Sequence, residues 1–319
     1  MIIKKRSLPL EIQLLEALSR RLPVSHPKYT LILENLAKKR AGYHGEKAID
    51  YYLDFISNEK YLILQNLRLQ DEKGYFQIDI LIVSTCFLLI LEVKNIIGTL
   101  VFDPQFHQVI RILDNKEEAF PDPLLQIDRQ TTRLKTWIQE HSYTHNIPVE
   151  SLVVVSNPHT IIKATTKPQL IAQKVIHSAY LPSKIKSLEI LYSSAILSTK
   201  EMKKLVRYLI RKQEDEQKKP LDYYNIHPNE IIKGVQCSRC RFVPMNRQHG
   251  LWFCPACASS CKSAHIQAIN DYALIISSTV TNQEIKQFLC LSSSATTKRL
   301  LSPYANSGVK KQRRYVISQ

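Results

Sequence analysis

Three ionisable side chains, Asp79, Glu92 and Lys94, lie in a stretch that is otherwise apolar. A charged group in an apolar strand is costly unless it is paired or bound to a metal. Residues two apart in a strand point to the same face, so Glu92 should lie beside Lys94. Two carboxylates suit Mg²⁺ or Mn²⁺, and an amine beside them can neutralise a phosphate in a transition state. The pattern favours phosphodiester hydrolysis, and a structural ion pair at a strand end is the alternative interpretation.

Two apolar runs, residues 77–83 and 87–94, must position these three groups. Both runs have the length of a strand and are rich in Ile, Val and Phe, and only Ser84-Thr85-Cys86 separates them. This pattern predicts a hairpin that is buried on both faces. Other apolar runs predict further strands at residues 61–67, 99–102, 108–112 and 151–157. The last of these should be central and parallel, which completes an α/β sheet.

Helices are expected around this sheet. Asp122 is suited to cap a helix that has Pro123 in its first turn. Its polar residues recur every three or four positions, and they are Gln126, Arg129, Gln130 and Arg133. A second helix is expected to begin at Gly42, which would place Glu46 in the first turn, where the helix dipole favours an acid. Two helices within residues 1–40 are expected to cover the sheet, and a further helix is expected over residues 198–211.

Four motifs occur in order along the chain: Gly42-Tyr43-His44-Gly45-Glu46, Gln77-Ile78-Asp79, Leu91-Glu92-Val93-Lys94-Asn95 followed by Gly98, and Pro123-Leu124-Leu125-Gln126. Together they resemble the nuclease-related domain (NERD) family, which is similar to the PD-(D/E)xK nucleases. The resemblance covers residues 40–140 and implies a restriction-endonuclease-like mixed sheet flanked by helices. It also implies a metal-dependent nuclease site lined by Glu46, Asp79, Glu92, Lys94 and Gln126, with Mg²⁺ or Mn²⁺ on Asp79 and Glu92. One departure is that Phe102 and Phe106 stand where family members often carry Trp.

Five of the seven cysteines lie between Cys237 and Cys261. Four of them form two Cys-x-x-Cys pairs that are separated by thirteen residues, and these are Cys237, Cys240, Cys254 and Cys257. Two such pairs around a short hairpin predict a zinc ribbon with a structural Zn²⁺ on four thiolates. Cys261 and His249 are the alternative ligands. Metal binding should supply most of the folding free energy of so small a unit.

The C-terminal residues predict a small helical domain. Helices are expected at residues 265–276, 281–289 and 292–301, and a basic wing is expected at residues 308–316. This order is typical of a helix-turn-helix, and a packing unit without DNA contact is the alternative. Basic residues expected to contact nucleic acid, here and elsewhere in the chain, are Arg129, Arg133, Arg239, Arg241, Lys298, Arg299, Lys310, Lys311, Arg313 and Arg314.

The composition of the chain indicates which class of partner it binds. The 319 residues include 44 Lys and Arg against 28 Asp and Glu, a formal charge of +16. Such a surplus favours a polyanion, because neutralising phosphates releases counterions. No apolar run reaches the roughly 18 to 20 residues that a membrane-spanning helix needs. DNA is therefore the expected partner and a membrane is not, while a homodimer is left open. The expected location is the cytoplasm, on the nucleoid if the source is bacterial.

The predicted domains are a nuclease-related domain with its N-terminal helices at residues 1–211 (core 40–140), a charged linker at 212–225, a zinc ribbon at 226–262 and a helix-turn-helix domain at 263–319. Two functions are consistent with this order. The first is a metal-dependent DNA nuclease that its C-terminal modules bring to DNA. The second is a non-catalytic DNA-binding or regulatory protein whose nuclease-like core is idle, because a fold alone does not establish an activity.

Overall fold

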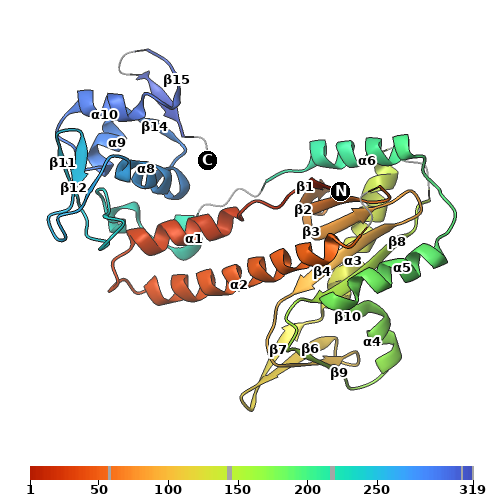
Figure 1. Ribbon diagram of the computed structural model, residues 1–319. Helices are drawn as coiled ribbons and strands as arrows, with labels where there is room; N and C mark the ends of the chain where they lie inside the picture. Colours follow the sequence, from red (N-terminus) through yellow and green to blue (C-terminus); the bar gives the residue numbers. More distant parts are fainter. Residues whose placement is uncertain (57–58, 142–145, 216–219, 310–311, 318–319) are drawn as a thin grey trace. The chain divides into compact units, whose positions relative to one another are not determined.

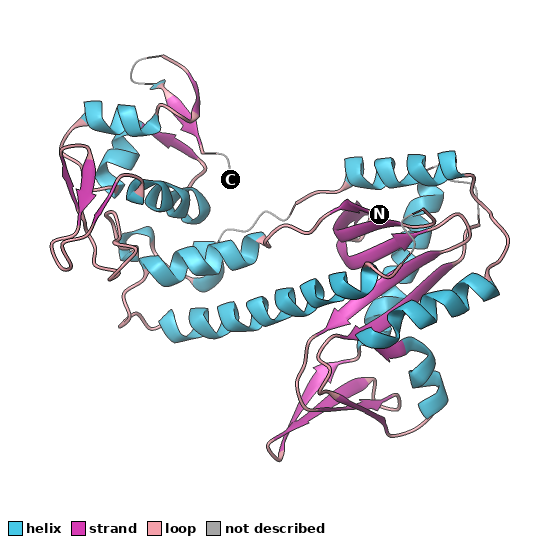
Figure 2. Ribbon diagram, viewed as in Figure 1, coloured by secondary structure: helices cyan, strands magenta, loops and turns pink. Residues whose placement is uncertain are grey.

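The structure, a computed structural model, describes residues 1–56, 59–141, 146–215, 220–309 and 312–317. The chain divides into two compact units (Figure 1). Unit 1 consists of Met1–Leu8 and Arg40–Glu216, and unit 2 of Pro9–Lys39 and Gln217–Gln319. Helices and strands occur in both units (Figure 2), so the expected α/β class is confirmed. Among the described residues, no helix combines the length and the apolar character that crossing a bilayer requires.

The main sheet of unit 1 has six strands in the order β1-β2-β3-β4-β8-β10. Their bounds are Ile2–Lys4 (β1), Leu62–Asp71 (β2), Gly74–Val83 (β3), Leu88–Lys94 (β4), Val149–Val155 (β8) and Val175–His177 (β10). Strands β3 and β4 are antiparallel neighbours, which confirms the predicted hairpin. Strand β8 lies parallel to β4 inside the sheet, also as predicted.

A second sheet of unit 1 has four strands in the order β7-β6-β5-β9. These strands are Thr99–Asp103 (β5), Gln108–Leu113 (β6), Lys116–Pro121 (β7) and Ile161–Ala164 (β9). The sequence predicts β5 and β6 but neither of the outer two strands. Strand β7 is rich in charged residues and largely exposed, and β9 has only four residues, so neither has an apolar pattern to reveal it.

Helices cover both faces of the main sheet. Helix α2 (Tyr29–Leu53) and α5 (Leu181–Leu191) contribute buried side chains to the apolar cluster on one face. Helix α3 (Pro123–Glu140) and α6 (Thr199–Lys212) do so on the other face. The predicted caps are present, because the Asp122 side chain accepts from the Leu124 backbone N–H and Ser198 forms a capping box with Glu201. Two shorter helical segments, α4 (Pro168–Lys174) and η1 (Ser178–Tyr180), flank β10.

Helix α2 differs from its prediction. It runs without a break through Gly42, so the predicted helix start there is wrong and Glu46 lies well inside the helix. The residues before Gly42 have helical apolar spacing, and a single glycine inside a helix costs only about 1 kcal/mol, which is too little to end it. Glu46 therefore gains nothing from a helix N-terminus, and its surroundings must be explained by tertiary contacts.

Unit 2 contains the cysteine-rich and C-terminal segments. It contains residues 29–39 of α2 and, in full, the helices α1 (Leu10–Arg21), α7 (Pro220–Tyr224), η2 (Pro228–Glu230), α8 (Ala264–Ile275), α9 (Asn282–Phe288) and α10 (Ser294–Leu301). Its strands form two small sheets, β11-β12-β13 and β14-β16-β15. Their bounds are Asn246–Gln248, Leu251–Phe253 and Ser260–Cys261 in the first sheet and Thr279–Thr281, Ala305–Ser307 and Arg314–Val316 (β14, β15, β16) in the second. The part of the predicted linker that α7 occupies is therefore helical.

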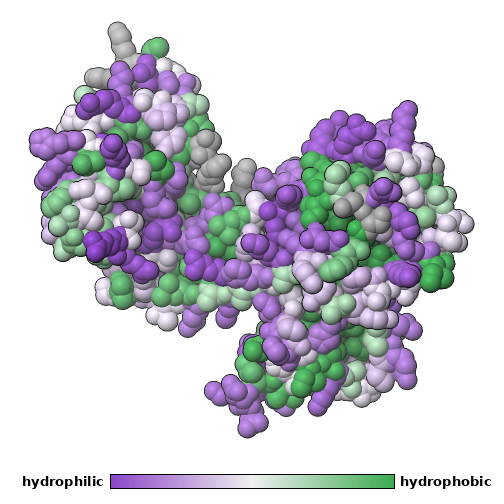
Figure 3. Space-filling view, viewed as in Figure 1, coloured by the Kyte–Doolittle hydropathy of each residue, from purple (hydrophilic) through white to green (hydrophobic). Residues whose placement is uncertain are grey.

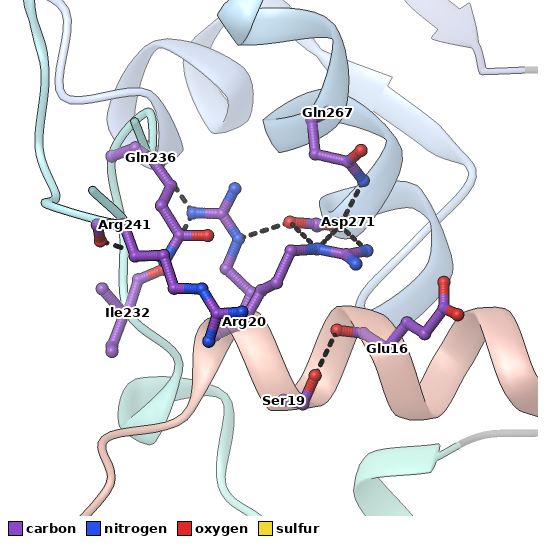
Figure 4. Close-up of polar contacts among 10 residues, drawn as sticks. Glu16, Ser19, Arg20, Ile232, Gln236, Arg241, Gln267 and Asp271 are labelled. Carbon is purple, nitrogen blue, oxygen red and sulfur yellow. Dashed lines mark hydrogen bonds and ion pairs between the residues drawn. The ribbon is translucent and has the colours of Figure 1, made fainter. Parts of the chain in front are cut away.

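Helix α1 packs on α8, more than 240 residues later in the chain. A buried ion pair joins them (Figure 4): Asp271 on α8 accepts from Nη2 of Arg20 and from Nε of Arg21, both at 2.7 Å. The Pro9–Lys39 segment therefore belongs to unit 2, and the expectation that both N-terminal helices cover the nuclease-like sheet is wrong. The apolar spacing of α1 reveals a buried face but does not reveal which partner covers it.

Candidate functional site

Lys94, the last residue of β4, contacts side chains from two elements. Its Nζ donates to Oε1 of Glu92 at 2.7 Å and to Oε1 of Gln126, on α3, at 3.0 Å. Glu92 is only 4 % exposed, and its Oε2 accepts from Nε2 of Gln130 at 2.9 Å. Val93 packs in the apolar cluster of the opposite face. The predicted juxtaposition of Glu92 and Lys94 is thus present, and two amide side chains of α3 hold it in place.

Asp79 lies on β3, next to the last position where β3 pairs with β4. Its Oδ2 accepts from the backbone N–H of Val93 at 3.0 Å. Desolvation by the surrounding protein and the negative charges of Glu92 and Glu46 raise the pKa of Asp79 well above its ordinary value. The two predicted acids therefore share one environment, and they repel each other there.

The strand is irregular at this position. Residues two apart normally share a face of a sheet, but Ile78 packs in the cluster of α3 and α6 and Ile80 in the cluster of α2 and α5. Asn66, across from Asp79 on β2, has a positive φ of 50°. At this irregular position the Asp79 carboxylate reaches the backbone of β4.

Glu46 comes to this end of the sheet from α2. Its Oε2 lies 3.3 Å from Nη1 of Arg6, and Nη2 of Arg6 lies 3.2 Å from Oδ1 of Asp50. Burial raises the pKa of Glu46, Arg6 opposes that shift, and the charges of Glu92 and Asp50 add to it. The Arg6 side chain is 4 % exposed, and the Gln65 carboxamide also contacts this group, because it donates to Asp50 and accepts from the Arg6 backbone.

Sequence reasoning misses Arg6, Asp50, Gln65 and Gln130. Arg6 lies outside every motif, and its partner Glu46 is 40 residues away. Gln130 is part of the polar stripe of α3, which a solvated face would produce as well, but the structure buries it against Glu92. A glutamine four residues after Gln126 was the signal available for this contact, because residues at that spacing share a helix face.

Arg6 provides a test of the charge balance around Glu46. We expect Arg6→Ala to lower the free energy of unfolding by about 2 kcal/mol at pH 8, because two carboxylates lose their cation. The pKa of Glu46 is raised in the folded state, so the folded protein keeps a proton that the unfolded chain releases at its ordinary pKa of 4.5. The free energy of unfolding therefore falls as pH rises above 4.5. Without Arg6 this fall should be larger and extend to higher pH. The free energy lost by Arg6→Ala should therefore be smaller at pH 4.5 than at pH 8, as measured by urea unfolding at both pH values.

The exposed neighbour Lys5 supplies the control Lys5→Ala. Equal losses for Arg6→Ala at both pH values would contradict the expectation.

The donor set at Asp79 and Glu92 fits a hard divalent cation. Both residues offer carboxylate oxygens, the ligands that Mg²⁺ and Mn²⁺ prefer. Oδ1 of Asp79 accepts no hydrogen bond from any described residue, and each Glu92 oxygen accepts only one side-chain hydrogen bond. A cation between these acids would also offset the repulsion that raises the Asp79 pKa.

The two α3 arginines that were expected to contact nucleic acid differ in their surroundings. Arg129 is exposed. Arg133 forms an ion pair with Asp71 and donates to the backbone carbonyls of Gly74 and Tyr75. Its guanidinium lowers the pKa of Asp71 and ties α3 to the turn between β2 and β3. The contacts of Arg133 are thus those of a structural residue.

The four predicted zinc ligands converge in unit 2. Cys237, Cys240, Cys254 and Cys257 offer sulfur atoms that all lie within 4.8 Å of one another. A hydrogen bond from Ser259 lowers the pKa of Cys237 to about 6, whereas desolvation and hydrogen bonds with neighbouring cysteines raise the pKa of Cys240 to about 12. The convergence of the four sulfur atoms is therefore the observation that favours zinc. Cys261, on β13, and His249, in the turn between β11 and β12, are not members of this cluster. The geometry is compatible with a zinc ribbon of the expected four ligands.

Removing zinc should unfold this part of unit 2. We expect one Zn²⁺ per chain, and its removal by a chelator should abolish the hydrogen-exchange protection of residues 237–257, because so small an apolar core does not fold alone. Peptides from β3 and β4 should stay protected. Cys240→Ser should lose the zinc and Cys261→Ser should keep it, as measured with a colorimetric zinc indicator. Loss of zinc from both variants would make Cys261 a ligand.

The other basic residues expected at nucleic acid lie in unit 2. Arg239 and Arg241 are exposed beside the cysteine cluster, and Lys298 and Arg299 are exposed on α10. Arg314 is exposed on β16, and Arg313 next to it is half-buried. Lys310 and Lys311 lie outside the described residues. Helices α8, α9 and α10 lie where the sequence predicts helices, and β15 pairs with β16. The helix-turn-helix and its contact with DNA stay predictions.

Unit 1 is thus an α/β unit whose central strands carry two acids and a lysine, with a glutamine of α3 in contact with the lysine. Residues 41–156 match the family model of the nuclease-related domain, NERD. The match confirms the resemblance, covers about a third of the chain, and includes Glu46 through Gln130 but neither Arg6 nor unit 2. No curated protein and no solved structure was found to match the chain.

Proposed function

We propose that this chain is a metal-dependent nuclease that hydrolyses phosphodiester bonds of DNA, and that unit 2 helps to bind the DNA. One observation carries the proposal: the Lys94 ammonium donates to Glu92 and Gln126 and its charge acts on the Asp79 carboxylate, in the segment that matches the nuclease-related domain. The proposal extends the family match to a reaction, a metal and a substrate. The formal charge of +16 supports a polyanionic substrate.

In the proposed mechanism Asp79 and Glu92 would hold Mg²⁺ or Mn²⁺. When bound, the cation would activate a water molecule and polarise the phosphate. The chain's own residues would do the rest. Gln130 fixes one oxygen of Glu92, while Glu92 and Gln126 orient the Lys94 ammonium, which would neutralise the charge that develops on the phosphate. Burial raises the pKa of Glu46, and Arg6 offsets part of that rise.

The direct test is cleavage of supercoiled plasmid DNA by the full chain. We expect nicked and linear products with Mg²⁺ or Mn²⁺ and none with EDTA. DNA binding should be measured in parallel in EDTA. Binding without cleavage under every metal condition would support the alternative, a DNA-binding protein with an idle nuclease-like core.

A further inference from the structure

The outward face of α6 carries a row of basic side chains. Lys200, Lys204, Arg207 and Arg211 follow one another at spacings of three and four residues, which places them on one side of the helix. All four are exposed, and with Tyr208 they line a shallow depression of about 400 Å³. Figure 3 shows hydrophilic surface over this helix. We call these four residues the α6 row.

The α6 row has an energetic cost that its surroundings do not offset. Like charges at this spacing destabilise a helix. Among the described residues, no member of the row forms an ion pair with an acid. The acid of the first turn, Glu201, is engaged in the capping box with Ser198. Four closely spaced cations without acidic partners are suited to a polyanion.

The opposite face of α6 distinguishes between two kinds of polyanion. Its buried side chains are Met202, Leu205, Val206 and Leu209, and they pack in the apolar cluster of the main sheet. A helix that lies in a membrane surface needs a free apolar face to insert among the lipids. Because α6 has already buried its apolar face in the protein, the row fits the regularly spaced phosphates of DNA better than a membrane.

Contacts between α6 and α3 relate the row to the candidate active site. Tyr208 contacts the ring of Trp137 on α3, with ring centroids 5.6 Å apart. Gln126 precedes Trp137 by eleven residues on that helix, which is about 17 Å at 1.5 Å per residue. The row therefore lies away from the candidate active site, beside the other end of α3.

We infer that the α6 row binds the phosphate backbone of the duplex DNA whose scissile bond lies at the candidate active site. The binding part of this inference depends only on the exposure, spacing and charge of the row. Its placement relative to a scissile bond rests on the proposed nuclease function. The two parts can be tested separately, because DNA binding does not require cleavage.

The test compares two triple variants of the full chain. The row variant is Lys200→Gln, Lys204→Gln and Arg207→Gln, and the control variant is Lys116→Gln, Lys163→Gln and Lys186→Gln, which removes three exposed charges from unrelated elements of unit 1. Arg211 stays in place because its guanidinium stacks on Tyr208. Binding to a fluorescent 30-base-pair duplex is measured in EDTA over a salt series, after circular dichroism has verified the fold.

Each phosphate contact contributes about 0.9 to the slope of log affinity against log salt concentration. The row variant should therefore have a slope about 2.7 units shallower than the wild type. When the salt concentration rises from 50 to 200 mM, the affinity of the wild type should fall by a factor about 40 times larger than the factor for the row variant. The control variant should keep a slope close to that of the wild type.

Equal slopes for the row variant and the control variant would overturn the inference. Anionic lipid vesicles form the second arm, and loss of vesicle binding with unchanged DNA binding would assign the row to a membrane and overturn the inference as well. All binding measurements are made in EDTA and do not depend on cleavage. They therefore test the row even if the nuclease proposal is wrong. The placement is then tested by footprinting, in which the row variant should lose protection on one side of the cleavage position and keep it at the cleavage position.

Discussion

Replacing Lys94 with Ala should reduce the rate of DNA cleavage by about 10²–10³-fold. The loss should be of this size because a positioned donor aimed at developing charge contributes about that much in enzyme sites. Here the ammonium donates to Glu92 at 2.7 Å and to Gln126 at 3.0 Å, so it is already positioned before the phosphate binds. The measurement is the initial rate of plasmid nicking at saturating Mg²⁺.

The metal dependence of the rate separates the roles of the residues. Asp79→Ala should lose at least as much activity as Lys94→Ala and should raise the metal concentration needed for the half-maximal rate, because it removes a proposed ligand. Lys94→Ala should leave that concentration nearly unchanged. Lys47→Ala is the matched control, because Lys47 is exposed on α2 next to Glu46. If the parent protein cuts no faster than both site variants, the nuclease proposal is wrong and the idle-core alternative remains.

The central hairpin and its charged residues were predictable because they depend on local rules. An apolar run of strand length identifies β3 and β4, and the two-residue period of a strand places Glu92 and Lys94 on one face. The caps of α3 and α6 are equally local, since Asp122 and Ser198 act on residues within one turn. The zinc ligands follow from spacing alone, because two Cys-x-x-Cys pairs bring four thiolates to one point.

The remaining parts of the site depend on contacts between distant segments. Arg6 reaches Glu46 only after β1 has joined the sheet beside β2. The irregularity at Asp79 involves Asn66 on a neighbouring strand, and no alternation pattern reports a positive φ. For Gln130 the pattern is visible but ambiguous, because a buried amide and a solvated one have the same spacing. Tertiary structure decides these cases.

The second large effect is expected in unit 2, where Asp271→Ala should lower the free energy of unfolding by about 3–5 kcal/mol. Asp271 is fully buried and accepts hydrogen bonds from Arg20, Arg21 and Gln267 (Figure 4). Arg21 is only 1 % exposed and also donates to the Gly234 carbonyl at 2.7 Å. Burial lowers the pKa of Arg21, and the Asp271 carboxylate opposes that shift. Removing the carboxylate leaves a buried guanidinium without its counter-charge.

The effect should be confined to unit 2, because the ion pair joins α1 to α8 within that unit. Hydrogen exchange can resolve this, and peptides from α1 and α8 should lose protection while peptides from β3 and β4 keep it. Asp222→Ala, at an exposed position of α7, makes the same chemical change and should cost less than about 0.5 kcal/mol. The double variant Arg21→Met with Asp271→Val removes both charges and should recover much of the lost stability, since an apolar pair closer in volume to the original side chains replaces a buried ion pair at little cost. If the double variant were as unstable as Asp271→Ala, packing of the Asp271 side chain, and not the unpaired charge of Arg21, would account for the loss.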